Sequence, residues 1–432
     1  MKFPGHRKNK HYFPVTEKDR VNLSQNFSND ESFHIVGIDQ LLVDIECHVD
    51  DAFLAHYDLK KGQSQLIDHP LCDEMYRILK AEKKITGEFA GGTVGNTLHN
   101  FCILSEERAV LLGAITQNIT IGDYAFKYIS STSSKVDLNH LQPCRTPMGR
   151  AMCFVTPDGE RTFAISKGCM NELSSEFIPS QVIENASALL ITAYILRDET
   201  WPISASTLKA CEIAKRAGVP IVLTLGTSSL IEEKRDFFMK FIQDHVNVLA
   251  MNFDEARALT QIDDPLLALE QVLDWTDMAL LTVGAQGLYV GGSVEEERAR
   301  RTEHELHTKS IVNYNLYEFS RAMKRSDCVK PIKIYSHINP FMGGPMVIRN
   351  TNGAGDGALS ALLHDMTANR YHRTKIPNSP KHNAPYLTYS SLSQICKYSN
   401  RVSFEILSKN SPRLFRGLPE REESLEEAYW AQ

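Results

Sequence analysis

Apolar residues along the chain alternate between short runs of strand length and longer stretches with helical spacing. The short runs lie at 34–39, 41–45, 188–195, 221–225, 246–250 and 278–283. Helical spacing lies at 204–217, at 231–244 and from about 253 onward. A chain that alternates strands and helices in this way forms a parallel sheet covered by helices on both faces, so the pattern predicts an α/β fold. Ligands of such sheets bind beyond the carboxyl ends of the strands, so the residues that follow each run are the first candidates for a site.

The most informative stretch is 351–357, which reads Thr-Asn-Gly-Ala-Gly-Asp-Gly. It stands between a short β-type run at 346–348 and a segment with helical spacing that begins near Ala358. Glycines at a corner between a strand and a helix let unpaired backbone N–H groups approach an anion, and the positive helix end favours it. Asp356 should remain ionised at neutral pH, because the same groups favour its charged form. It is therefore placed to take a proton from a group that attacks a bound phosphate.

Three other known motifs have sequences close to that of this loop. A plain helix start capped by Asp356 fits the stretch equally well. The dinucleotide fingerprint also fits Gly353, Gly355 and Ala358, but it needs an acidic residue about 20 positions later to hold a ribose. Residues 366–404 contain no Asp or Glu, which argues against it. A P-loop is excluded, because the chain contains no Gly-Lys pair.

Acidic residues and a glycine turn near the first strands are weaker candidates. Asp39 and Asp44 stand at strand ends, where an isolated acid is more often a turn or cap residue than a ligand for hydroxyl groups. The Gly91-Gly92 turn opens a helix expected around 96–104. Its glycines permit close contact with a ligand but do not require one.

Two later strand ends carry further candidates. Asn252 and Glu255 have the spacing of a helix capping box, and the functional alternative is that Glu255 helps to hold a hydrated magnesium ion beside phosphates. Gly284 and Gly287 form either a hairpin turn or a place that clears room for a nucleotide.

The remaining regions bound the domain organisation. Residues 1–32 are polar and read as an N-terminal extension. Asp158-Gly159 predicts a hairpin between two alternating runs. Residues 291–345 lack a strand and helix rhythm and are interpreted as an insertion, whereas 394–407 has helical spacing.

Composition narrows the class of partner. The 432 residues suffice for one large α/β domain with an appended piece or for two domains. With 47 Lys and Arg against 53 Asp and Glu, the net charge of −6 indicates no affinity for nucleic acid, so small molecules are the expected ligands. The nine cysteines form no C-x-x-C pair and suit a reducing compartment. No apolar run is long enough for export or membrane insertion, so we expect a cytoplasmic protein without membrane contact.

The order of these motifs resembles the ribokinase (PfkB-type) family of sugar and nucleoside kinases. The shared features are an early strand with a sugar-binding Asp, a Gly-Gly turn followed by Asn, an N-x-x-E, a glycine turn after the next strand and a late G-A-G-D. The resemblance covers about 34–410, and 351–356 is its most specific part. Residues 39–44, the long insertion before the loop and 391–403 are more narrowly similar to the bacterial members that act on inosine and guanosine.

The resemblance implies a fold and an activity. The fold is a ribokinase-like three-layer sandwich over 33–432, with a central mostly parallel sheet and a small β lid from about 40–90 and 142–166. The activity is ATP-dependent phosphorylation of the 5′-hydroxyl of inosine and guanosine, giving IMP and GMP for purine salvage. Closure of the lid would expel water, so that the ribose rather than water receives the phosphoryl group.

The resemblance also implies site residues by position. Asp356 would be the base, and the N–H groups of Gly353, Ala354 and Gly355 would stabilise the transferring phosphoryl group. The nucleoside site would contain Asp39, Gln40, Asp44, Gly91, Gly92, Thr93, Gly95, Asn96 and Arg197. The ATP site would contain Asn252, Thr282, Gly284, Gly287, Thr351, Asn352 and Asn400, with Glu255 at Mg²⁺.

Several alternatives stay open at this point. Asn350 stands where most members of the family have Asp, which leaves a K⁺ requirement undecided. Whether the chain forms a homodimer is also undecided. The nearest alternative activity is the same chemistry on adenosine or ribose. An alternative of another class is a non-catalytic nucleoside- or nucleotide-binding protein, in which Asp356 only caps a helix.

Overall fold

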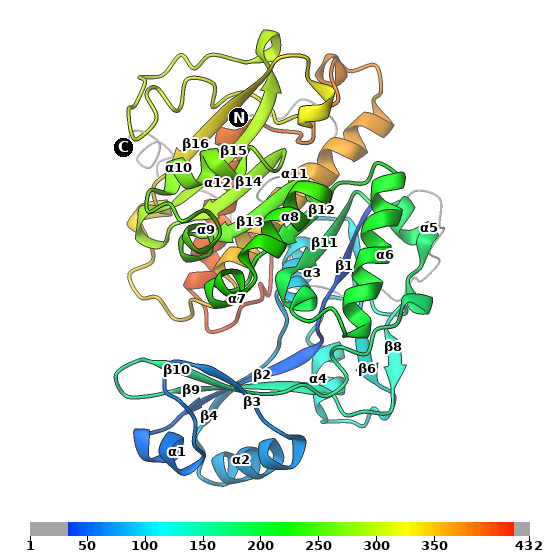
Figure 1. Ribbon diagram of the computed structural model, residues 1–432, viewed down its shortest axis with the longest axis vertical. Coiled ribbons are helices and arrows are strands. Elements are labelled where there is room, and N and C mark those ends of the chain that lie inside the picture. The colour runs from blue at the N-terminus through cyan, green and yellow to red at the C-terminus, as the bar shows by residue number, and fades with distance from the viewer. Residues whose placement is uncertain (1–32, 419–432) are drawn as a thin grey trace.

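The computed structural model describes residues 33–418, and the predicted N-terminal extension at 1–32 lies outside that range. A nine-stranded sheet runs through the upper part of the molecule in the order β16-β15-β14-β13-β12-β11-β1-β5-β7 (Figure 1). Its first seven strands along the chain are mutually parallel, and β15 runs antiparallel to both of its neighbours, β14 and β16. Their bounds are β1 His34–Ile38, β5 Arg108–Leu112, β7 Val136–Asp137, β11 Ala188–Thr192, β12 Ile221–Thr224, β13 Val248–Asn252, β14 Met278–Thr282, β15 Leu288–Glu295 and β16 Pro331–Ile338.

Helices cover both faces of this sheet because successive strand residues point to opposite sides. Ile35 packs in one buried cluster with α3 and α11, whereas Val36 packs in another with α6 and α8. One helical layer consists of α3 Thr93–Leu104, α11 Ala354–Lys375 and α12 Leu392–Leu407. The other consists of α5 Ser180–Glu184, α6 Pro202–Arg216, α7 Ser228–Glu233, α8 Arg235–His245, α9 Phe253–Thr260 and α10 Pro265–Val272. The predicted α/β sandwich of three layers is confirmed.

A second, five-stranded sheet lies below the carboxyl ends of the main strands, in the order β3-β10-β9-β2-β4 (Figure 1). Residues 39–41 lead directly from β1 into β2, so the two sheets share one continuous stretch of chain. The strands are β2 Leu42–His48, β3 Ser64–Leu66, β4 Ile85–Ala90, β9 Gly149–Val155 and β10 Arg161–Ser166. Two helices, α1 Asp51–His56 and α2 His69–Ala81, contribute Leu54, Met75 and Leu79 to its buried side. The hairpin predicted at Asp158-Gly159 joins β9 to β10.

A third pairing stands apart from both sheets. Two short strands, β6 Ala114–Thr116 and β8 Gln142–Cys144, pair only with each other. Residues 142–144, which the sequence assigned to the lid, therefore do not belong to the five-stranded sheet. The helix α4 Tyr124–Ser130 contacts β4 and β2 of the five-stranded sheet.

Four expectations about local structure were wrong. Residues 346–348 form no strand and are largely exposed, because the main sheet already ends at β16 and no neighbour is left to pair with them. Residues 291–345 are not irregular throughout, since β15 and β16 extend the sheet at both ends of that range. The helix expected at 231–244 divides into α7 and α8, and the strand expected at 188–195 ends at Thr192 in a 3₁₀ turn.

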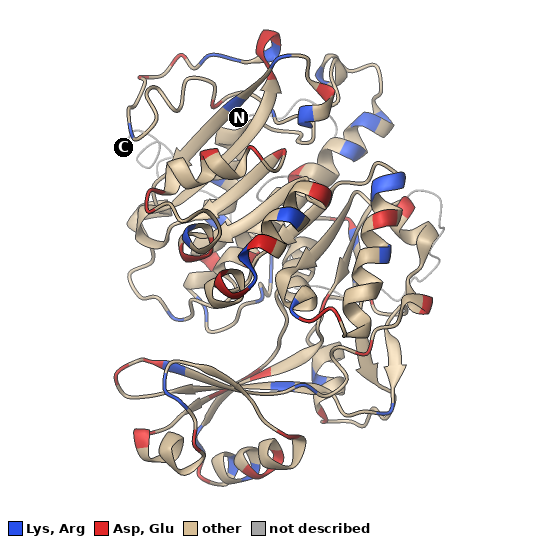
Figure 2. Ribbon diagram, in the orientation of Figure 1, with Lys and Arg blue, Asp and Glu red and all other residues tan. Residues whose placement is uncertain are grey.

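Three further observations concern the surface charges, the length of the helices and the thiols. Acidic and basic residues are interspersed on the outer helices and loops in the view of Figure 2. Among the described residues, every helix is too short or too polar to cross a membrane. All nine cysteines are free thiols, and eight of them are buried.

Candidate active site

The carboxyl ends of the parallel strands meet at the edge that faces the second sheet (Figure 1). Asp39 directly follows β1, Asn252 is the last residue of β13, and Thr282 is the last residue of β14. Asn252 and Thr282 are paired in register. Predicted site residues from distant parts of the sequence therefore line a single edge, as parallel strands require.

The glycine loop forms the start of α11. Gly353 is the N-cap residue and has a φ of 83°, a conformation that favours glycine. A Cβ at Gly353 would lie 2.5 Å from the Pro412 Cβ, whereas a Cβ at Gly355 would meet nothing within 4 Å. Asp356 lies in the first turn, and no side chain of the described residues caps the helix. The reading of Asp356 as a helix cap is therefore wrong, and an open helix N-terminus of the kind that binds anions remains.

Asp356 lies among other acidic groups. Its Oδ2 accepts a hydrogen bond of 3.5 Å from Nδ2 of Asn96, which is on α3. Burial raises the pKa of Asp356 to about 8, against the lowering effect of the Asn96 amide, and the charges of Asp39, Glu255 and Asp44 raise it further. The expectation that Asp356 stays ionised at neutral pH was wrong, because the sequence shows neither how deeply its carboxyl group is buried nor how many carboxylates lie near it.

Asp39 lies beneath the first turn of α3. Its Oδ2 accepts a hydrogen bond of 2.7 Å from the backbone N–H of Gly95, and its Oδ1 accepts one of 2.9 Å from that of Gln40. The side chain is 2% exposed, and burial raises its pKa to about 7 despite these two donors. A Cβ at Gly92 would collide with Asp39 Oδ2, so this turn must be glycine. Asp39 thus also holds the start of a helix, as the alternative reading expected.

Asp44 belongs to the second sheet, on β2. A Cβ at Gly91 would lie 2.7 Å from Asp44 Oδ2, so the glycine turn packs against this carboxylate as well. Burial raises the pKa of Asp44 to about 7, and the guanidinium of Arg413 opposes the rise. The Gly91-Gly92 turn is therefore packed between the two early aspartates, one directly after β1 and the other on β2. Thr93 begins α3 directly after it.

Asn252 and Glu255 form the predicted capping box. The Asn252 Oδ1 accepts from the Glu255 N–H at 2.9 Å, and Glu255 Oε2 accepts from the Asn252 N–H at 2.9 Å. Glu255 is 4% exposed, and burial raises its pKa to about 7. Because its charge also acts on Asp356, the capping role and a place beside the phosphate loop are compatible.

Three further predicted residues lie at the same edge and have contacts of their own. Gln40 Nε2 donates to Asn171 Oδ1 at 2.5 Å. The Arg197 guanidinium lies 5.8 Å from the centre of the Tyr194 ring. A Cβ at Gly287 would collide with the Ile338 carbonyl, which explains that glycine without a ligand.

Three other predicted ATP-site residues differ in their surroundings. Asn400 Nδ2 donates to the Asn339 carbonyl at 2.7 Å, and its Oδ1 accepts from the Phe341 N–H at 3.2 Å. This side chain therefore holds the backbone of 339–341. Gly284 is exposed, and Thr282 is half-buried.

Two arginines were not singled out from the sequence. Arg161, on β10 of the second sheet, donates from Nη1 to Asn352 Oδ1 at 2.8 Å and to Thr351 Oγ1 at 3.4 Å. Arg413, after α12, donates from Nε to Asn96 Oδ1 at 2.8 Å. Both contacts span more than 180 residues of sequence, so no local pattern could have revealed them.

Both polar atoms of the Asn350 side chain form hydrogen bonds with backbone groups. The Asn350 Oδ1 accepts from the Asn352 N–H at 2.8 Å, and its Nδ2 donates to the Asn410 carbonyl at 3.4 Å.

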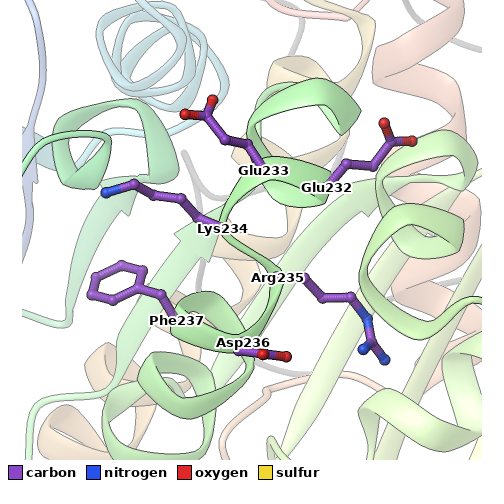
Figure 3. A pocket seen from close by; sticks show the side chains of 6 residues that line it. All are labelled: Glu232, Glu233, Lys234, Arg235, Asp236 and Phe237. Carbon is purple, nitrogen blue, oxygen red and sulfur yellow. The ribbon is translucent and has the colours of Figure 1, made fainter.

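A pocket of about 340 Å³ lies where α7 passes into α8 and is lined by 232–237 (Figure 3). Because it contains none of the predicted site residues and comes from one short segment, we assign it no chemistry.

Comparisons with known proteins identify the family and the fold. The model of the pfkB family carbohydrate kinases matches residues 80–305. The guanosine-inosine kinase of Escherichia coli strain K12 is 54% identical over 432 residues, which is the full length of both chains. Among solved structures, a probable sugar kinase from Rhizobium etli superposes with a TM-score of 0.66 at 20% identity, covering 92% of this chain and 98% of its own. The adenosine kinase of Sinorhizobium meliloti gives 0.63 at 20% identity, covering 93% and 100%. The chain belongs to the pfkB family of carbohydrate kinases.

Proposed function

We propose that the protein transfers the γ-phosphoryl group of ATP to the 5′-hydroxyl of inosine and guanosine, giving IMP and GMP for purine salvage. The observation that carries the proposal is Asp356 at the open N-terminus of α11, among the carboxyl groups of Asp39 and Asp44. The full-length identity of 54% to a guanosine-inosine kinase supports the choice of nucleosides. The free thiols suit the reducing cytoplasm, where we place the reaction.

Asp39 and Asp44 would hold the ribose. Both are acceptors that lie at the Gly91-Gly92 turn, one directly after β1 and the other on β2. Vicinal hydroxyl groups donate hydrogen bonds to carboxylates, and glycine allows the sugar to approach the backbone between them. The nucleoside would then present its 5′-hydroxyl to Asp356, which is linked to the same helix α3 through Asn96.

Asp356 would act as the base. As the O5′–P bond forms and the bond from phosphorus to the leaving ADP oxygen breaks, the hydroxyl proton passes to the Asp356 carboxylate. The N–H groups of Gly353, Ala354 and Gly355, with the helix dipole behind them, would stabilise the charge on the phosphoryl oxygens. The open space at Gly355 supports this role, because a phosphate can reach the backbone there.

Magnesium fits the acidic edge only as a hydrated ion. Among the described residues, no three Asp, Glu, His or Cys side chains converge on one point. Mg²⁺ beside nucleotides is usually held by one or two carboxylates, by phosphates and by water, and Glu255 suits that arrangement. The ion neutralises charge on the phosphates when it is bound. We include no potassium site, because Asn350 is a neutral amide whose oxygen already accepts from a backbone N–H.

The second sheet would act as a lid. Arg161 connects it to the loop before α11 through Asn352 and Thr351. Such a contact would bring the sheet over the phosphates and exclude water, so that the ribose hydroxyl is the acceptor.

The decisive experiment is a single-turnover assay with magnesium-ATP and guanosine. Inosine, adenosine and ribose in parallel distinguish the proposed substrates from the nearest alternatives. We expect Asp356→Asn to lower turnover by about 10²–10⁴-fold with guanosine binding retained. Asp263→Asn, an exposed Asp to Asn change, is the matched control. Near wild-type turnover of Asp356→Asn would show that Asp356 is not the base.

The same assay addresses the non-catalytic alternative. If the wild-type protein binds guanosine tightly and turns over none of the four acceptors, it is a binding protein rather than a kinase. Calorimetric titration with guanosine measures that binding without depending on turnover.

A further inference from the structure

Arg413 belongs to the segment 408–418 after α12 and is 4% exposed. Its guanidinium contacts helix α3 and the residues just after helix α4, both far away in the sequence. Nε donates to Asn96 Oδ1 on α3 at 2.8 Å, and Nη1 donates to Thr132 Oγ1 at 2.9 Å and to the Ser131 carbonyl at 3.2 Å, just after α4. A cation with this many fixed partners has one orientation.

The segment around Arg413 is anchored on both sides of the candidate site. The Asn100 side chain donates to the Pro412 carbonyl at 3.1 Å and accepts from the Leu414 N–H at 2.8 Å. Pro412 packs directly against Gly353 in the phosphate loop. Arg413 is therefore carried by a piece of backbone that touches both α3 and the start of α11.

The hydrogen bond from Arg413 decides which way the Asn96 amide faces. The Nε–H of arginine is always a donor, so only the amide oxygen of Asn96 can face it. The amide nitrogen of Asn96 then faces Asp356 Oδ2, 3.5 Å away. In the reversed orientation, two donors would face each other at Arg413, and two acceptors would face each other at Asp356 once its carboxyl is ionised. An N–H directed at a carboxylate favours its ionised form, which is the form a base requires.

The positive charge of Arg413 also acts on the two early aspartates. Asp39 Oδ2 and Arg413 Nη2 both lie within about 3.5 Å of the point where a Cβ on Gly95 would stand. The titratable groups that face the guanidinium are Asp39, Asp44, Tyr128 and His99. Of these, only the two aspartates can carry the opposite charge near neutral pH.

We propose that Arg413 is a positioning residue of the kinase site, which orients the Asn96 amide toward Asp356 and supplies the opposite charge for Asp39 and Asp44. The inference rests on the proposed function. The segment after α12 would thus contribute to catalysis, although none of its atoms touches a substrate.

Substitutions that separate the hydrogen bond from the charge test this inference. Arg413→Lys keeps a cation but loses the Nε–H donor, so we expect kcat to fall by about 10–100-fold with the KM for guanosine nearly unchanged. The rise of kcat/KM with pH should also move to higher pH. Arg413→Met removes the charge as well, so the KM for guanosine should rise while the KM for ATP does not. Arg416→Lys, in the same segment but exposed, is the matched control and should resemble the wild type.

A double-mutant cycle excludes a merely structural role. If Arg413 acts through Asn96, Arg413→Lys should lose most of its effect on kcat in an Asn96→Ala background. Additive effects, or an unchanged pH profile in an Arg413→Lys protein with wild-type circular dichroism, would overturn the inference. Should Arg413→Met fail to fold, the lysine variant and the cycle decide.

Calorimetry separates this inference from the proposed function. If the wild type phosphorylates no purine nucleoside, the proposed function fails. Even then, at least about tenfold weaker guanosine binding by Arg413→Met than by Arg416→Met supports the role of the charge, and equal binding refutes it.

Discussion

The guanidinium of Arg161, on β10 of the second sheet, donates a hydrogen bond of 2.8 Å to Oδ1 of Asn352, in the loop before α11. One residue belongs to the second sheet and the other to a loop of the main domain, and the two are 191 positions apart in the sequence. Because Asn352 directly precedes Gly353, this contact brings a positive charge from the second sheet beside the backbone that we expect to hold the phosphates.

Arg161→Gln should therefore lower kcat by about 10–100-fold and leave the KM for guanosine within about twofold, because the lost donor belongs to the phosphate side. Steady-state kinetics with each substrate varied in turn measures both effects. Arg145→Gln, a change at an exposed arginine close to the second sheet in sequence, is the control. A variant that loses guanosine affinity instead would place Arg161 at the nucleoside.

The pH dependence of activity should follow the acidic groups of the site. Burial raises the pKa of Asp356 to about 8 and the pKa values of Asp39 and Asp44 to about 7. All three are needed as carboxylates, so kcat/KM for guanosine should rise between about pH 6 and about pH 9, with its midpoint near the pKa of the base. A profile that is flat or falls over this interval would contradict the assignment of Asp356 as the base.

The titration of Asp356 should make stability fall with rising pH, whereas activity should rise. The folded-state pKa of Asp356 lies above its ordinary value of 3.8, so the folded protein holds a proton that the unfolded chain releases. This contribution to stability is complete below about pH 4 and is lost as the pH rises through about 8. Asp356→Asn cannot lose that proton, so its Tm relative to wild type should increase from pH 5 to pH 9.

Thermal unfolding at both pH values measures this difference. Asp263→Asn changes an exposed group and should show the same Tm offset from wild type at both pH values. A constant offset for Asp356→Asn as well would mean that its carboxyl is not raised by its surroundings.

Two glycines of the phosphate loop should respond differently to the same substitution. Gly353→Ala forces a residue with a φ of 83° into a Cβ contact with Pro412, so we expect a loss of about 1–3 kcal/mol in the free energy of unfolding. Gly355→Ala adds its Cβ in open space near the start of a helix, so stability should be unchanged or slightly higher.

The activity of the Gly355→Ala protein should nevertheless fall, because the added methyl group stands where a phosphate would approach the backbone. Chemical denaturation gives the stabilities, and the KM for ATP reports on the phosphate approach. If Gly355→Ala keeps both stability and the wild-type KM for ATP, the phosphates do not bind at this helix start.

Local patterns were sufficient for most of the elements. The strands β1, β2 and β11 to β14 and the helices α6, α9, α11 and α12 follow from apolar runs and helical spacing, because each depends on residues close in sequence. The capping box of Asn252 and Glu255 is likewise local, since its two hydrogen bonds join residues three positions apart. The exposed run at 346–348 is a counterexample, because strand-forming composition produces a strand only where a neighbouring edge is free.

By itself, the sequence determined the α/β class, the strand ends at which ligands bind and the presence of Asp356 beside glycines that can hold a phosphate. These depend on periodicity and on backbone freedom, which are properties of a few adjacent residues. Only the tertiary structure decided that Asp356 shares its surroundings with Asp39, Asp44 and Glu255, and that its pKa is raised. Only the fold also brings Arg161 and Arg413 to the site, because burial and charge depend on neighbours that lie more than 180 residues away along the chain.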